Sequence, residues 1–101
     1  MKKHGDDSID SGHWPDTSRL LEEMGKLQQV LGKLLGTGGE VNHWDGSNLR
    51  ERLVEELADL KAAIWLFENF NLTSEEKQAI VRRFHKKLDL FEKWHKEKTK
   101  P

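Results

Sequence analysis

The sequence contains no cysteine, so it offers neither a disulfide framework nor a zinc site built on thiolates. It also lacks tyrosine and has only two prolines, Pro15 and Pro101, so the strongest helix breaker is absent between them. No apolar run approaches the roughly 20 residues that a membrane-spanning helix needs. These absences favour long uninterrupted helices, and we expect no membrane partner.

Charged residues make up 35% of the 101-residue chain and hydrophobic residues another 35%, which is too apolar for a fully disordered protein. The net charge is −1, although residues 73–101 hold nine basic against five acidic residues. Without an overall basic excess or an interleaved stacking pattern, we expect no nucleic-acid partner. A single small domain with this much charge is expected to cover its apolar faces as a homodimer or homotetramer.

Composition divides the chain into three parts. Residues 1–16 contain glycine, serine and aspartate without a hydrophobic period, which predicts a partly mobile N-terminal arm. Residues 17–98 carry the periodicity of a helical domain, and residues 99–101 form a short tail. The first lysines are not followed by an apolar stretch, so we expect no signal peptide and a cytoplasmic location.

Hydrophobic spacing predicts three principal helices and no strand, which is an all-α fold. The expected inner faces are Leu20, Met24, Leu27, Leu31 and Leu34 in the first helix, Leu49, Leu53, Leu57, Leu60, Ile64 and Phe67 in the second, and Ile80, Phe84, Leu88 and Phe91 in the third.

Start and stop signals delimit these helices. Capping boxes are expected at residues 48–51 and 73–76, opening the second and third helices. Asp16, Thr17 or Ser18 can cap the first helix, and the glycine-rich residues 36–39 are expected to end it.

Carboxylates accompany the apolar stripes of the first two helices. Glu56 and Asp59 are three residues apart, so they project from one helix face, and Glu23 can face them if the two helices pack antiparallel. Converging carboxylates repel unless a cation lies between them, and Mg²⁺ prefers oxygen ligands while leaving room for phosphate. The competing interpretation is an ordinary solvated acidic face, which is the commonest role of such pairs.

The segments 21–29 and 48–60 resemble the MazG-like all-α nucleoside triphosphate pyrophosphohydrolases, and most of all their short single-domain members often found in phage genomes. The resemblance covers roughly residues 18–94. The family signature is Glu-Glu-x-x-Glu on one helix and Glu-x-x-Asp on the next. The resemblance implies an oligomeric helical bundle that binds Mg²⁺, with Mn²⁺ as an alternative ion, through Glu23, Glu56 and Asp59. It also implies cleavage between the α and β phosphates.

Lys26 departs from this signature, because it stands where the resemblance implies a fourth acidic ligand. An ammonium at a cation site is expected to weaken Mg²⁺ binding, with the loss of one of two ions. Two other arrangements stay open. Lys26 can turn outward to pair with Glu22, or it can bridge to Asp59 as a built-in cation in place of the metal.

Hydrolysis of a phosphoanhydride also needs an oriented water and contacts to the substrate. Glu22 or Glu55 can accept a proton from the water. A basic cluster on the third helix can contact phosphate oxygens or form an exposed basic face: Arg82, Arg83, Lys86 and Lys87. Trp14 and Trp44, both in loops, can stack on a nucleobase or cover the end of the bundle.

The expected function is therefore Mg²⁺-dependent hydrolysis of a nucleoside or deoxynucleoside triphosphate to a monophosphate and pyrophosphate. Glu22, Glu23, Glu56 and Asp59 form the catalytic set, and Arg83, Lys86, Lys87 and Trp44 the substrate contacts. The alternative is a catalytically impaired relative that keeps the fold and acts as a binding or interaction protein. Lys26 is the residue that separates the two.

Overall fold

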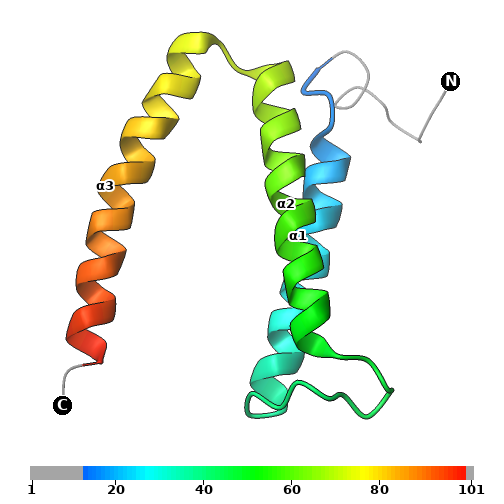
Figure 1. The fold of residues 1–101 in the computed structure, drawn as a ribbon. Coiled ribbons are helices and arrows are strands. Elements are labelled where there is room, and N and C mark those ends of the chain that lie inside the picture. Colours follow the sequence, from blue (N-terminus) through cyan, green and yellow to red (C-terminus); the bar gives the residue numbers. More distant parts are fainter. Residues whose placement is uncertain (1–12, 100–101) are drawn as a thin grey trace, which may run out of the picture. The chain divides into compact units, whose positions relative to one another are not determined.

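The computed structural model describes residues 13–99, and three helices account for its regular structure. They are α1 (Thr17–Gly36), α2 (Leu49–Asn71) and α3 (Ser74–Lys98) (Figure 1). The all-α prediction is confirmed, since no strand occurs within residues 13–99. Most of the predicted arm, residues 1–12, and residues 100–101 of the predicted tail lie outside the described part. None of the helices in residues 13–99 has the length and apolar character needed to cross a membrane.

The chain forms two compact units, with α1, α2 and their connecting loop in the first and α3 in the second. In the first unit, α1 and α2 lie side by side and run antiparallel (Figure 1). We call their contact line the seam. Buried and half-buried residues at helical spacing define it: Leu20, Glu23, Leu27, Val30 and Leu34 on α1, and Leu49, Leu53, Glu56, Leu60, Ala63 and Phe67 on α2.

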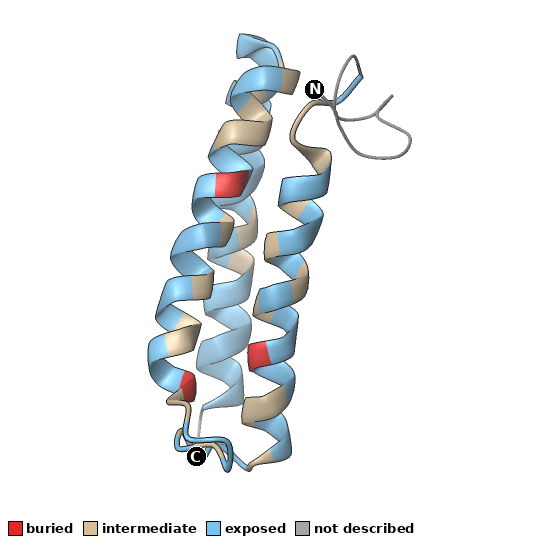
Figure 2. Ribbon diagram, turned by 90° about the vertical axis from the view of Figure 1, so that its right-hand side faces the viewer, coloured by how far each residue is buried: buried red, intermediate tan, exposed pale blue. Residues whose placement is uncertain are grey.

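The apolar centre of the seam is small. Among the described residues, Val30, Leu49 and Ala63 are the ones that are buried, at separate points along the hairpin (Figure 2). Most other apolar side chains of the hairpin keep part of their surface open to solvent. The hairpin therefore has a narrow core, and its stability depends on a few contacts.

The seam keeps most residues of the predicted inner faces, but on each helix it is shifted to one side by less than one residue. Met24 and Leu31 remain 48% and 45% exposed, while Glu23 and Val30 occupy the seam instead. On α2, the exposed Leu57 and Ile64 likewise give way to the residues just before them, Glu56 and Ala63. The shift is smaller than the roughly 100° that one residue spans, because Leu20, Leu27 and Leu34 belong to both the predicted and the observed face, and apolar stripes this wide allow it.

The ends of α1 are fixed by backbone geometry and by one long-range contact. At its end, Gly38 and Gly39 adopt positive φ angles of 65° and 94°, which glycine enters without steric cost, so the predicted stop is confirmed. At its start, Asp16 is the N-cap but has φ 70° and no capping bond from its side chain, so the predicted side-chain cap by Asp16 is wrong. The Asn71 side chain donates to the Pro15 carbonyl at 2.8 Å and ties this start to the end of α2.

The loop before α2 is organised by its own polar side chains. The Ser47 hydroxyl and backbone N–H both donate to the Asp45 carboxylate, at 2.6 Å and 3.0 Å, and they hold the pKa of Asp45 well below its usual range. The Asn48 side chain then accepts from the Glu51 N–H at 3.0 Å, which is the N-cap half of the predicted capping box. These bonds set where α2 begins.

The second unit begins with a complete capping box. The Thr73 hydroxyl accepts from the Glu76 N–H at 3.1 Å, and the Glu76 carboxylate accepts from the Thr73 N–H at 2.9 Å. The predicted box is confirmed, and it fixes the start of α3 at Ser74.

Removing the Thr73 hydroxyl should destabilise α3. We expect Thr73→Ala to lower the free energy of unfolding by about 1 kcal/mol, because the Glu76 N–H loses its partner at the helix terminus. Thr73→Ser keeps the hydroxyl and should lie within about 0.5 kcal/mol of the wild type. Urea unfolding followed by circular dichroism measures both variants, and equal losses for the two would contradict the capping role.

Candidate metal centre

Two helices bring three carboxylates together at the seam. Glu23 lies in the second turn of α1, and Glu56 and Asp59 lie one turn apart on α2. Because the helices are antiparallel, the Glu23 side chain meets the pair on the opposite helix. One carboxylate oxygen from each residue lies within 4.8 Å of the other two. The predicted convergence of Glu23, Glu56 and Asp59 is thus confirmed as geometry.

The burial of this trio differs from one member to the next. The Glu23 side chain is only 13% exposed, and Glu56 is half-buried, whereas Asp59 is exposed. One oxygen of Glu23 and one of Glu56, Oε1 in each, are buried without a hydrogen-bond partner. A carboxylate oxygen removed from water without a partner is destabilising, and here two such oxygens belong to groups of like charge. Asp59 leaves one side of the cluster open to solvent.

A divalent cation fits this donor set. Hard cations bind carboxylate oxygens at about 2.0–2.6 Å, which places the ligand oxygens around one ion within about 5 Å of each other. The trio meets that spacing with one oxygen from each residue. A cation bound by the trio would also neutralise the two carboxylates whose Oε1 atoms are buried without a partner. The residues present therefore suit a site for a metal ion with oxygen ligands.

Lys26 supplies a positive charge at the edge of the trio. Its Nζ lies 3.5 Å from Glu23 Oε2, one turn away on the same helix, and its side chain is 45% exposed. Glu23 and, to a lesser extent, Glu22 raise the pKa of Lys26, and Glu56 acts in the same direction. Lys26 therefore pairs with Glu23 and not with Glu22 or Asp59, the two partners that the sequence suggested. The i,i+3 spacing accounts for it, since Glu23 is held in the seam next to the Lys26 stem.

The other predicted residues of the first unit lie outside the trio. Glu22 and Glu55 are exposed on α1 and α2, each one residue before a seam carboxylate. Trp44 is 89% exposed in the loop before α2, with its ring 5.3 Å from the His43 ring. Trp14 stacks on Phe67 with 6.3 Å between ring centroids, which supports the interpretation that it covers the end of the hairpin.

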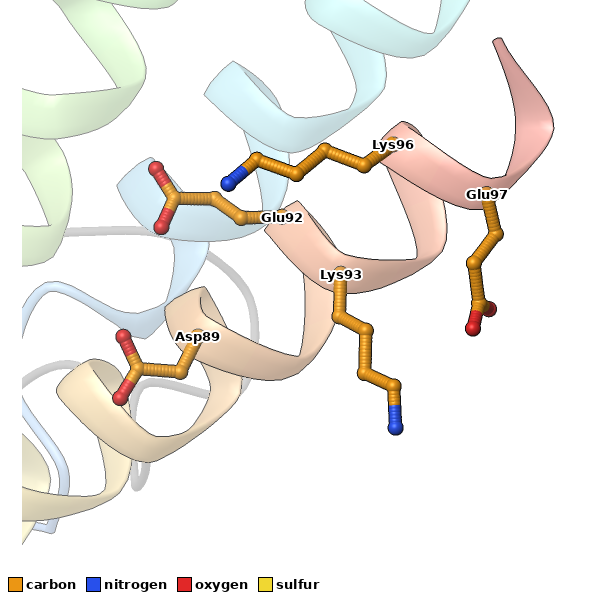
Figure 3. Close-up of a pocket in the computed structure, with 5 residues that line it drawn as sticks. All are labelled: Asp89, Glu92, Lys93, Lys96 and Glu97. Carbon is orange, nitrogen blue, oxygen red and sulfur yellow. The ribbon is translucent and has the colours of Figure 1, made fainter. Parts of the chain in front are cut away.

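The predicted phosphate contacts, Arg83, Lys86 and Lys87, all belong to α3. The Lys87 ammonium lies 5.6 Å from the centroid of the Phe91 ring, in cation–π range, and their binding of substrate stays a prediction. Further along α3, a shallow hollow is lined by charged side chains of that one helix (Figure 3): Asp89, Glu92, Lys93, Lys96 and Glu97. Its charges are of both signs, as is common on a solvated helix face, so it adds no binding site.

Comparison with known proteins identifies no relative. No protein-family model, no curated protein and no solved structure matches the chain. The features that indicate a function are therefore the trio, Lys26 and the sequence pattern.

Neutralising one seam carboxylate should stabilise the metal-free protein. In a chelator, Glu56→Gln is expected to raise the free energy of unfolding by about 1 kcal/mol, a shift in Tm of about 5 °C, because one charge leaves the cluster. Excess Mn²⁺ should raise the Tm of the wild type but not that of the variant, because a ligand that binds only the folded state stabilises it. Thermal scanning with and without Mn²⁺ measures both effects.

Glu68→Gln is the matched control for this experiment. It makes the same change on the same helix, three turns beyond Glu56. We expect a change in stability below about 0.5 kcal/mol and a response to Mn²⁺ equal to that of the wild type. An equal Mn²⁺ response in Glu56→Gln would contradict the metal centre.

Proposed function

We propose that this protein is a Mg²⁺-dependent hydrolase that converts a nucleoside or deoxynucleoside triphosphate to the monophosphate and pyrophosphate, with Mn²⁺ as a substitute metal. The observation that carries the proposal is the pair of buried, unpartnered oxygens of Glu23 and Glu56 beside Asp59. The resemblance of the segments around them to MazG-like pyrophosphohydrolases supplies the reaction.

Each member of the trio has a role in the proposed site. Glu23, Glu56 and Asp59 would hold the ion, which when bound neutralises charge on the phosphate oxygens. Glu23 and Glu56 anchor it from the seam, where packing restricts their side chains. Asp59, being exposed, lies where a phosphate chain can enter from solvent.

The remaining residues handle the water and the substrate. Glu22, an exposed carboxylate next to Glu23, accepts the proton of the attacking water. The water oxygen bonds to one phosphorus while the bridging bond between the α and β phosphates breaks. On α3, Arg83, Lys86 and Lys87 keep their predicted role as phosphate contacts, for which arginine offers bidentate donors and lysine positive charge.

Trp44 is the proposed contact to the base. Its ring is almost fully exposed and so is open to stacking on a planar ligand. The trio lies further along α2 from Trp44, since Glu56 is seven residues, or about 10 Å, beyond Leu49.

The proposed activity is tested by pyrophosphate release from a panel of nucleoside triphosphates with Mg²⁺ or Mn²⁺. We expect release by the wild type and a fall in kcat/KM of at least about 100-fold in Glu56→Gln, because metal affinity and activity depend steeply on ligand residues. Glu68→Gln should stay within about twofold of the wild type, as a substitution distant from the site. Release that survives Glu56→Gln would contradict the assigned site.

Lys26 favours a second candidate, a catalytically impaired relative that binds nucleotide or a partner without turnover. The observation is its ion pair with Glu23, which places an ammonium on one of the proposed metal ligands. No release by the wild type on any nucleotide, combined with release by Lys26→Glu, would establish this alternative.

We further propose that a second copy of the chain covers the exposed apolar surface of the hairpin. Exposed apolar side chains on both helices include Leu31 and Leu35 on α1 and Leu57 and Ile64 on α2. An apolar patch contributed by two adjacent helices marks an interaction site more often than a monomer surface.

Light scattering at micromolar concentration tests this assembly. We expect a mass of two or four times the 11.8 kDa of one chain, and Leu57→Glu should reduce it because a charge would enter the interface. A mass of one chain for the wild type would contradict the proposal.

A further inference from the structure

Lys26 gives the proposed metal centre a charge that suits one divalent ion. The three carboxylates carry −3 and Lys26, in contact with Glu23, carries +1, so together they carry −2. Glu22 adds a further negative charge nearby, but it is exposed and therefore strongly screened by water. One divalent cation brings this set to neutrality.

Without Lys26, the metal-bound site would have a different net charge. Three carboxylates around one divalent ion keep a charge of −1, which repels an approaching phosphate chain. With Lys26 present that residual charge disappears. The ammonium is 45% exposed, and Glu23 uses one of its three N–H donors, which leaves donors for a ligand at the open side of the site.

Lys26 also lowers the affinity of the site for a metal ion that is not bound to phosphate. The ammonium lies 3.5 Å from an oxygen of Glu23, so a metal ion bound by Glu23 shares that carboxylate with a second positive charge. Two cations on one carboxylate repel, which weakens the binding of the metal alone. A phosphate chain placed between the two cations relieves that repulsion, so it contributes more free energy here than at a purely acidic site.

We propose that Lys26 couples the metal ion to the phosphate chain, so that the site binds a metal–polyphosphate complex in preference to the free ion. This inference rests on the proposed function, since it assumes a divalent ion at Glu23, Glu56 and Asp59. It names Lys26 as a substrate-binding residue and a condensed phosphate as the ligand class. Coupling of this kind is reciprocal: each ligand raises the affinity for the other by the same factor.

The test compares two binding constants in four proteins. Electron paramagnetic resonance follows binding of Mn²⁺ alone. Calorimetry follows binding of Mn²⁺-saturated imidodiphosphate, a pyrophosphate analogue with nitrogen in place of the bridging oxygen. The proteins are the wild type, Lys26→Met, Lys26→Arg and Lys33→Met. Lys33→Met is the matched control because it removes the same charge from the same helix about two turns further on.

We expect Lys26→Met to move the two constants in opposite directions. Affinity for Mn²⁺ alone should rise about three- to tenfold, and affinity for the Mn²⁺–imidodiphosphate complex should fall about tenfold, as expected for losing one partly exposed charge. Lys26→Arg keeps the charge and should lie within about twofold of the wild type for both. Lys33→Met should change neither. A purely structural role for Lys26 would instead shift both constants in the same direction.

The outcomes separate this inference from the proposed function. Unchanged imidodiphosphate affinity in Lys26→Met, or a parallel shift of both constants, would overturn the coupling role. The metal centre would survive that result if Glu56→Gln still abolishes Mn²⁺ binding. Absence of Mn²⁺ binding in both the wild type and Lys26→Met, with and without imidodiphosphate, would overturn both proposals.

Discussion

The contact between α1 and α2 includes two carboxylates that lie where an apolar side chain would be expected. Glu23 and Glu56 occupy the seam at the same helical spacing as Leu27, Leu53 and Val30, and each has a buried oxygen without a partner. Packing pulls these side chains out of water, while their charge and mutual repulsion oppose that burial. A cation bound between them would resolve the conflict, so the packing of the hairpin and the proposed site involve the same side chains.

The sequence predicted the elements of the fold well and their rotation poorly. Caps and glycines are local signals, and they placed the start of α3 and the end of α1 correctly. The face that each helix turns to its partner is a tertiary property. On α1, Leu20, Leu27 and Leu34 belong to the predicted stripe and to the observed seam, so spacing alone did not distinguish Glu23 from Met24.

The residues of the candidate site could be predicted from the sequence, because residues three positions apart on a helix lie on the same face. Glu56 and Asp59, three residues apart, had to share a face whichever way α2 turned, and an antiparallel partner brings Glu23 within reach. The partner of Lys26 was not predictable in this way. Glu22 and Glu23 both lie within one turn of it, and the choice followed from which glutamate the seam holds in place.

The observed seam withdraws Glu23 and Glu56 partly from water, while the apolar Met24 and Leu57 beside them are exposed. Local departures from the packing rule of this kind are expected where a chain gives up stability for a site. The side chains left outside, Leu57 and Ile64 among them, are then available for contact with another copy. In the proposed arrangement, one face of each helix would hold the metal centre and the adjacent face would contact another copy.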